Sequence, residues 1–413
     1  MNPNKINKIP NNTKLIDIVK SGKILSLDEV LIKIIDSRKI NHLHKYKIQN
    51  LIKLVILALV SGYSGYRAFE VFASENSHLC GCPSKSTFQR VCVGINQDIL
   101  KEILCDWIVS ILVAFNYDFS NSIASLDGKC LNGHVKNPNG KLQSLNVYLQ
   151  DIGILLSSSL FEGKKSSEVN VFREYINNEH IKTFTADALH LNTETLNSLR
   201  FNKKKFVIAC KRKHLNQTMI KEGKLIRSEL IIYKNSERMI EIRSINKRFK
   251  VVKNSQSYTY KKNLPLELLK RKNKNNAKPK KDTVTIKVKE RISWENTGIK
   301  ALITVKTVVK DQLNGDQTIS RNYVSNISPR TKPQNFERII RERWGVENGL
   351  HRSLDMVYKE DDRYTTNINS AIFFNTLSSF VISIFRLNNY STTEKTIRMF
   401  CNRIDKSLEL LGC

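Results

Sequence analysis

Residues 142–163, LQSLNVYLQDIGILLSSSLFEG, decide the fold of this chain. Two runs rich in Leu, Ile, Val and Tyr flank the sequence Asp-Ile-Gly at 151–153, and this arrangement is typical of two strands joined by a tight turn. The stretch therefore predicts an antiparallel β-hairpin. The preceding segment SIASLDG, residues 122–128, predicts a short strand that ends at Asp127 and a glycine turn.

The segments that follow the hairpin alternate between helix and strand. SSEVNVFREYINN at 166–178 has a capping serine and helical spacing, and NTETLNSLR at 192–200 predicts a second helix. Between and after them, IKTFTADALHL at 181–191 predicts a strand that ends near Asp187, and KFVIACK at 205–211 predicts another. The order β-β-β-α-β-α-β favours an α/β fold with a mixed sheet, the beginning of an RNase H-like domain flanked by helices.

The remaining sequence suggests three further regions around this α/β unit, which we place at 116–215. Residues 1–115 predict an N-terminal helical domain, which suits DNA binding but is equally compatible with a plain helical bundle. Residues 216–330 predict a β-rich insertion, and residues 331–413 return to helical spacing.

The charge of the chain points to an anionic partner. Its 413 residues include 68 Lys and Arg against 38 Asp and Glu, a formal net charge of +30. Nucleic acid and anionic membranes are the usual partners of such a protein. The basic run LLKRKNKNNAKPKKD at 268–282 is either a solvated loop or an arm that neutralises phosphates.

Other features argue against a membrane protein and against a secreted one. The longest apolar runs, from Leu51 and from Ala371, contain polar interruptions and fall short of the roughly 20 apolar residues that a membrane span needs. The first residues have no apolar segment typical of a secretory signal. The eight cysteines are scattered, without zinc-site spacing. We therefore expect a cytoplasmic protein with reduced, mostly buried thiols.

Three carboxylates stand out as a candidate metal site. Asp127 and Asp187 follow strands whose carboxyl ends should meet at one edge of the sheet. Glu347 lies in RERWGVENGLHRSLDM, where helical spacing would put it one turn after Arg343. Each residue alone has an ordinary explanation: a turn aspartate, an early helix cap, and a surface ion pair. Together they suit Mg²⁺, which prefers hard oxygen ligands, and phosphodiester cleavage by two metal ions. We interpret His351 as a structural residue bonded to a neighbour, and Trp344 and Tyr364 as packing residues.

Several motifs resemble those of a known family, the H-repeat-associated insertion-sequence transposases, a branch of the DDE transposases. SLDGKCLNG is similar to the family's first-aspartate motif, GKKSSEVNVF to the segment after the hairpin, and FTADALHLN to the second-aspartate motif. The stretch RERWGVENGLHRSLDMVYKEDDRY resembles the C-terminal signature and is the most specific match. SGYSGYRAFEVFA and PSKSTFQRV resemble the family's N-terminal associated domain, so the resemblance spans about residues 25 to 388.

The resemblance implies a DNA transposase that cleaves at the ends of an insertion sequence and transfers the strands into target DNA. Asp127, Asp187 and Glu347 would be the catalytic, metal-binding triad, holding two Mg²⁺ ions for which Mn²⁺ can substitute. A homodimer on DNA is expected, because two element ends react together. The resemblance also implies a bacterial, nucleoid-associated protein that has no small-molecule substrate. We assign DNA contacts to Arg343, the arginine that accompanies the glutamate, and to four further basic residues: Lys129, Lys211, Arg212 and Lys213.

The sequence also departs from the wider family signature. Ile340 and Leu354 stand where that signature has a Tyr and a Lys, so those two roles are not carried over. The segment IACKRKHLNQ is more basic than its counterpart in the family. Two alternatives remain open: an inactive or repurposed copy that only binds DNA, and a structure-selective nuclease on the same core.

Overall fold

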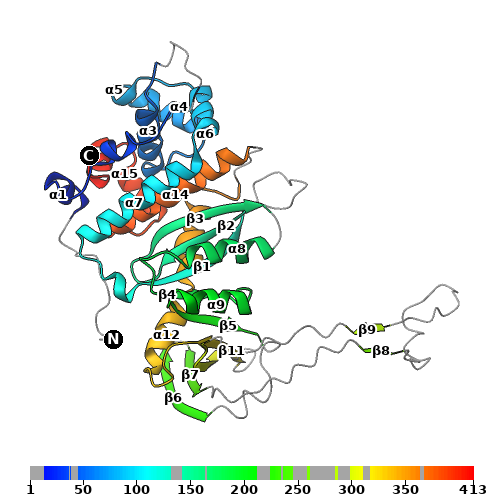
Figure 1. The fold of residues 1–413 in the computed structure, drawn as a ribbon. Coiled ribbons are helices and arrows are strands. Elements are labelled where there is room, and N and C mark those ends of the chain that lie inside the picture. The colour runs from blue at the N-terminus through cyan, green and yellow to red at the C-terminus, as the bar shows by residue number, and fades with distance from the viewer. Residues whose placement is uncertain are drawn as a thin grey trace.

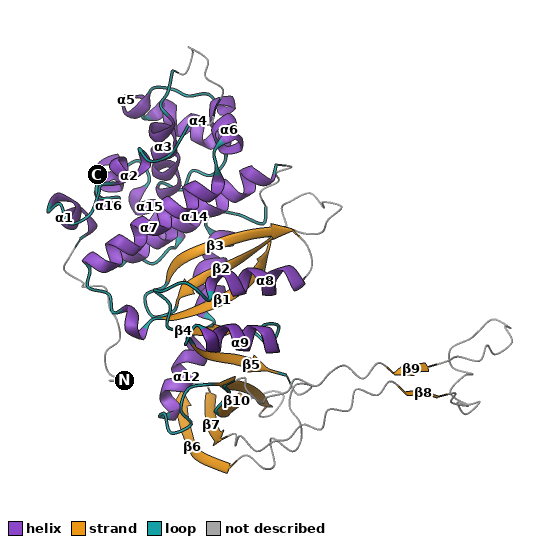
Figure 2. Cartoon of the chain, viewed as in Figure 1, coloured by secondary structure: helices purple, strands orange, loops and turns teal. Residues whose placement is uncertain are grey.

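The computed structural model of the chain is built on a single nine-stranded sheet with helices on its faces and at one end (Figure 1). The strand order is β3-β2-β1-β4-β5-β11-β10-β7-β6. Figure 2 shows that most helices gather beside the β3 edge of this sheet. The structure describes residues 14–36, 38, 45–131, 142–162, 165–211, 224–233, 236–244, 258–260, 284–286, 298–309, 317–362 and 367–413.

The predicted hairpin is confirmed. Strands β2 (Leu142–Leu149) and β3 (Ile154–Glu162) pair antiparallel around Gly153, whose φ of +72° is accessible at little cost only to glycine. Strand β1 (Ile123–Cys130) is longer than predicted, because β2 pairs with it as far as Cys130. The expectation of a turn after Asp127 is therefore wrong, and Asp127 lies inside a strand.

The alternation of helix and strand after the hairpin is also as predicted. Strands β4 (Thr183–Ala186) and β5 (Lys205–Cys210) run parallel to each other, and β4 is parallel to β1. Helices α8 (Lys165–Tyr175) and α9 (Thr193–Phe201) precede β4 and β5. The protein is thus a mixed α/β fold whose sheet contains parallel pairs and is flanked by helices.

The strand-rich region extends this same sheet. Strands β6 (Lys224–Tyr233), β7 (Ser236–Ser244), β10 (Ala301–Val309) and β11 (Gln317–Ser325) are joined to it where β11 pairs antiparallel with β5. Strands β8 (Tyr258–Tyr260) and β9 (Val284–Ile286) form a separate pair. The basic run at 268–282 lies outside the described residues.

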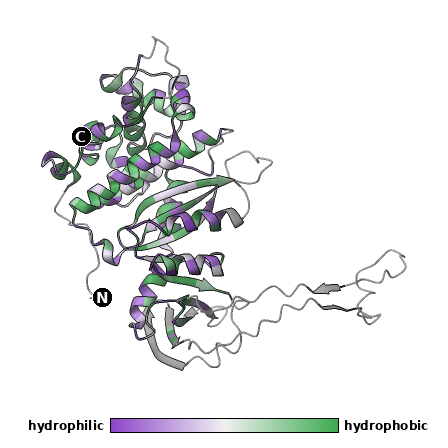
Figure 3. Cartoon of the chain, in the orientation of Figure 1, coloured by the Kyte–Doolittle hydropathy of each residue, from purple (hydrophilic) through white to green (hydrophobic). Residues whose placement is uncertain are grey.

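An N-terminal helical region packs together with the last helices of the chain. Helix α14 lies against α3, α6, α7 and strand β3, and one continuous hydrophobic core extends from α1 into the sheet. Figure 3 shows hydrophobic and hydrophilic residues alternating along α7, as expected for a helix with one buried face. The expected division near residue 115 therefore does not separate two cores. The helices of this layer are α1 (Leu15–Lys20), α2 (Leu27–Leu31), α3 (Ile48–Val60), α4 (Tyr66–Glu75), α5 (Ser77–Cys80), α6 (Lys85–Gly94), α7 (Gln97–Ala114), α14 (Ile368–Leu387), α15 (Glu394–Phe400) and α16 (Ile404–Leu410).

Helix α14 is longer than the sequence led us to expect. Its 20 residues make it long and apolar enough to cross a membrane by length and composition alone. Most of the helix is nevertheless buried inside the fold against α3, α6, α7 and β3. This is the packing of a core helix.

The element that carries the third carboxylate begins with helix α12 (Pro333–Glu342). Its apolar face, with Phe336, Ile339 and Ile340, is buried in a second hydrophobic cluster that also includes residues of β5, β7, β10 and β11. The chain continues through η3 (Val346–His351), a π-helical segment, into α13 (Arg352–Met356). This run passes behind the sheet, on the face opposite α8 (Figure 1).

Candidate functional site

The two aspartates meet at one end of the parallel strands. The last residue pair between β1 and β4 is Ser125 with Thr185, and Asp127 and Asp187 each lie two residues further along. Both line one polar cavity of about 420 Å³, together with Gly128 and Glu168. The expected convergence of the first two carboxylates is therefore what the fold produces, although Asp127 stands within a strand.

Glu347 lies in η3. The prediction that it follows Arg343 by one turn of a regular helix is wrong. Helix α12 ends at Glu342, and a turn separates it from the π-helical segment, so Arg343 and Glu347 do not share a continuous α-helix. Glu347 is exposed, whereas Val346 and Leu350 are fully buried beneath it. A π-helical turn inserts one extra residue per turn and is frequent at functional sites.

Gly349 allows η3 to lie close to strand β2. A Cβ atom on Gly349 would stand 2.7 Å from the hydroxyl of Tyr148, a distance that real side chains do not adopt. A Cβ atom on Gly345 would meet the same ring at 3.4 Å, which is ordinary van der Waals contact. Tyr148 is itself almost fully buried, so the segment that carries Glu347 is seated on a fixed aromatic ring.

The three predicted acids act on one another electrostatically. The pKa of Asp127 is raised to about 7, first by burial and then by the negative charge of Glu347, with smaller contributions from Asp187 and Glu168. The guanidinium of Arg343 opposes this rise. The charges of all three other acids therefore act on Asp127. Glu347 does not line the cavity, but it lies close enough to influence Asp127 electrostatically.

The carboxylate oxygens of the site suit a hard divalent cation, but they are not close enough together to coordinate one. Within the described residues, no three His, Cys, Asp or Glu side chains stand close enough to form a ready-made metal site. Carboxylate oxygens are the ligands that Mg²⁺ prefers. The chemistry of the donors therefore fits Mg²⁺, and ligation would require the side chains to move together.

Arg343 is a candidate for binding an anion. It directly follows α12, is half-buried, and acts on Asp127 through its charge. Its Nε atom is buried without a hydrogen-bond partner among the described residues. A guanidinium within electrostatic range of Asp127 is suited to bidentate phosphate binding, because its fork of N–H donors matches two phosphate oxygens.

Lys129 is placed differently from our expectation of a DNA contact. Its side chain is 7% exposed, and its ammonium pairs with Asp355 and with Glu360 at 2.6 Å, while Asp361 lies 3.9 Å away. The pKa of Lys129 is raised by these acids although burial alone would lower it. Such a buried, paired ammonium stabilises the fold and does not suit the phosphate contact that we predicted for Lys129.

The other predicted cations are only partly described. Lys211 is exposed, directly follows β5, and lines the same cavity as Asp127 and Asp187. Arg212 and Lys213 lie outside the described residues, as does Tyr364. Trp344 is half-buried, and the guanidinium of Arg321 lies 4.8 Å from its ring centre.

One residue on the η3 side of the site, Asn146, was not identified from the sequence. Asn146 stands directly opposite Asp127 in the β1–β2 pairing, and its amide donates to Nε2 of His351 at 2.9 Å. This assigns the ring proton to Nδ1, which lies 3.6 Å from Oδ2 of Asp127. Burial, with the charge of Lys129, lowers the pKa of His351 to about 4, so the ring is neutral. The prediction of a neighbour-bonded histidine holds, but the neighbours belong to the site.

Two further residues, Glu168 and His190, were missed on the α8 side. Both line the cavity, and Oε1 of Glu168 accepts a hydrogen bond from Nε2 of His190 at 3.2 Å. No spacing rule links an acid near the start of one helix to a histidine in a later loop. Their presence within GKKSSEVNVF and FTADALHLN was the only available signal.

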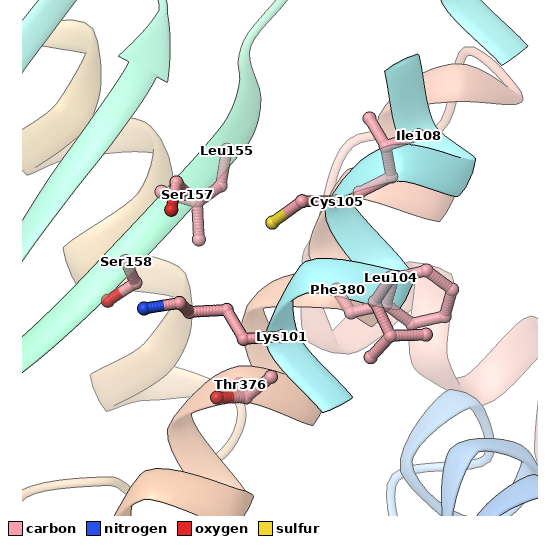
Figure 4. Close-up of a pocket in the computed structure, with 9 residues that line it drawn as sticks. All are labelled: Lys101, Leu104, Cys105, Ile108, Leu155, Ser157, Ser158, Thr376 and Phe380. Atoms are coloured by element: carbon pink, nitrogen blue, oxygen red, sulfur yellow. The ribbon is translucent and has the colours of Figure 1, made fainter. Parts of the chain in front are cut away.

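A second, much smaller cavity lies between α7, β3 and α14 (Figure 4). It has a volume of about 20 Å³, enough for about one water molecule. Lys101 points toward the serines of β3 and donates to Oγ of Ser159 at 3.4 Å, and burial raises the pKa of the Cys105 thiol to about 12. A protonated thiol in so small a space offers no reactive nucleophile.

Compared with known proteins, the chain matches no family model and no curated protein. The resemblance to DDE transposases therefore depends on the motifs quoted above.

Proposed function

We propose that this protein is a DNA transposase of the DDE type. The observation that carries the proposal is the convergence of Asp127 and Asp187 on one cavity, with Glu347 near enough for its charge to raise the pKa of Asp127. These are the three carboxylates that the family resemblance selects. Their separation along the chain makes such a meeting informative, because only the tertiary fold can produce it.

The sheet topology supports the same proposal. The order β3-β2-β1-β4-β5, with an antiparallel hairpin beside parallel strands, is what we expect of an RNase H-like core. Strands β6, β7, β10 and β11 would then be the β-rich insertion between the second aspartate and the glutamate, here extending the sheet at the β5 side. The segment η3 would supply the glutamate from one face.

In this proposal each residue has a distinct task. Asp127 and Asp187 would hold Mg²⁺ at the strand ends, and Glu347 would complete the ligand set. The bound ions would supply a nucleophile at neutral pH and stabilise the leaving oxygen. Arg343 would fix a phosphate beside the acids, and the neutral ring of His351 would keep Asp127 oriented through its Nδ1 proton. Exposed Lys211 would draw the DNA backbone toward the cavity.

A cleavage assay tests the proposal. The full-length protein would be incubated with Mg²⁺ and DNA from the sequences that flank its gene, with EDTA as the control. We expect strand cleavage at the element ends and joining of pre-cleaved ends to a plasmid. Binding without cleavage would favour a repurposed DNA-binding copy, and cleavage without joining would favour a nuclease.

Asp187→Asn gives the matching single-residue prediction. Removing one ligand charge should slow cleavage by at least about 100-fold, while DNA binding changes by no more than about two-fold. Asp362→Asn, an acid of the same charge outside the cavity, is the control. Cleavage at the normal rate by Asp187→Asn would remove this aspartate from the site.

A further inference from the structure

Glu168 is an acid that the predicted triad does not include, although it lines the same cavity. It lies in the first turn of α8, and the residue is 9% exposed. Asp127 and Asp187 are its acidic neighbours in the cavity wall. A buried carboxylate requires compensation by hydrogen bonds or a cation, because burial of an uncompensated charge is costly.

The carboxylate of Glu168 lies directly against the backbone of β1. A Cβ atom on Gly128 would stand 3.0 Å from its Oε1 and 3.1 Å from its Oε2. Side chains alternate along a strand, so Asp127 faces His351 on the η3 side while Gly128 faces α8. Only a glycine at 128 lets the Glu168 carboxylate come this close to the residue that follows Asp127.

His190 holds this carboxylate in place. Its Nε2 donates to Oε1 of Glu168, its ring stacks on Phe172 of α8 at 4.5 Å between centroids, and Nε2 lies 3.9 Å from Oδ1 of Asp187. His190 is 1% exposed, and its Nδ1 is buried without a hydrogen-bond partner in the described part of the chain. His190 thus keeps one unsatisfied nitrogen while its ring lines the cavity.

We propose that Glu168 is a fourth carboxylate of the metal site and that His190 is its positioning residue. Glu168 would present oxygen to a divalent cation from the α8 face, opposite the face from which Glu347 approaches. The hydrogen bond from His190 would orient the ligating carboxylate, as outer partners of metal ligands commonly do. This inference rests on the proposed function, because it assumes that Asp127 and Asp187 bind metal.

Direct Mn²⁺ binding to the full-length, DNA-free protein tests the inference independently of cleavage. Mn²⁺ would be titrated and the unbound ion followed by electron paramagnetic resonance. Glu168→Gln keeps the size of the side chain and an acceptor for His190 but removes the charge. We expect it to weaken Mn²⁺ binding by about ten-fold or more. Glu174→Gln, on the same helix but exposed and outside the cavity, should bind Mn²⁺ like the unaltered protein.

Stability without metal separates a ligand from a structural ion pair. If Glu168 is a ligand, Glu168→Gln should unfold at the same or a higher denaturant concentration, because one repelling charge has gone. If Glu168 only ties α8 to His190, the variant should be less stable, because a neutral amide oxygen is a weaker acceptor than a carboxylate. It should then bind Mn²⁺ normally, which would overturn the inference. Should the variant fail to fold, Glu168→Asp keeps the charge, withdraws the carboxylate by one methylene, and should show the same loss of affinity.

Mn²⁺ binding and DNA cleavage together distinguish a failure of the proposed function from a failure of the role proposed for Glu168. Unaltered protein that neither binds Mn²⁺ nor cleaves DNA would overturn the proposed function and this inference together. Unaltered protein that binds and cleaves, with Glu168→Gln indistinguishable from it in Mn²⁺ affinity, would overturn only the role of Glu168.

Discussion

The surroundings of Asp127 raise the pKa of its carboxyl group to about 7. Burial makes the largest contribution, because it disfavours the charged form, and the charge of Glu347 adds to it. Arg343 is the cation that acts against this rise. At the scale of single residues, the site therefore consists of acids that repel one another and one guanidinium that offsets part of the repulsion.

Arg343→Ala should impair DNA cleavage without unfolding the protein. A charge-assisted hydrogen bond contributes about 1.5–3 kcal/mol, so the cleavage rate should fall about 10- to 100-fold. Single-turnover cleavage and denaturant unfolding would be measured together. Arg341→Ala, which removes an exposed charge from the end of α12, should cleave normally. A variant of Arg343 that lost only stability would show that the guanidinium is structural.

At the scale of elements, the position of Glu347 depends on how η3 is seated. Tyr148 of β2 supports the segment from below at Gly345 and Gly349, and a buried ion cluster fixes the chain that follows it. In that cluster Lys129 of β1 pairs with Asp355 and Glu360, and Glu360 also accepts from Nδ2 of Asn375 in α14 at 2.8 Å. The glutamate is thus held by contacts with β1, β2 and α14.

Gly349→Ala should disturb the packing of η3 against Tyr148. Alanine usually stabilises a helix relative to glycine, but here its methyl group would collide with the Tyr148 hydroxyl. We expect a loss of about 1–3 kcal/mol in the free energy of unfolding, together with slower cleavage.

Two matched variants check this explanation. Gly345→Ala, whose methyl would meet the ring at 3.4 Å, should be nearly neutral. Adding Tyr148→Phe to Gly349→Ala removes the hydroxyl and leaves the nearest ring carbon at 3.6 Å, so stability and cleavage should recover. Failure of the double variant to recover would mean that the clash is not the cause.

Lys129→Met should destabilise the protein through the ion cluster. It leaves Glu360, which is 9% exposed at its side chain, without its ammonium partner. Breaking a buried pair by removing one partner costs about 3–5 kcal/mol, and chemical denaturation would measure the loss. Lys129→Arg retains the charge and should lose less. DNA affinity of the folded variant should be unchanged, whereas weaker DNA binding would restore the phosphate-contact role of Lys129.

At the scale of the whole molecule, the net charge of +30 should govern the association with DNA that we propose. Each phosphate neutralised by the protein releases counterions, so affinity falls steeply with salt. If about six phosphates are engaged, affinity should fall about 10³-fold between roughly 50 and 200 mM salt. Binding isotherms over that range would measure the slope, and a flat response would contradict electrostatic DNA binding.

Much of the fold follows from local patterns in the sequence. The glycine turn at 153 and its flanking apolar runs specify the hairpin, and Asn192 caps α9 by accepting from the amide of Thr195. These features act within a few residues, so they can be read without knowing the fold. The same reasoning selected Asp127 and Asp187, because parallel strands collect their carboxyl ends at one edge of a sheet.

By itself, the sequence determined the order of strands and helices, the excess of positive charge, and the identity of the three candidate acids. The tertiary structure decided how those acids are held. Three arrangements join residues that are far apart in the chain. They are the packing of the π-helical segment with Glu347 on Tyr148, the burial of Lys129 among acids, and the approach of Glu168 to Gly128. Local periodicity carries no information about such contacts, because they depend on which surfaces meet when the sheet and its helices pack.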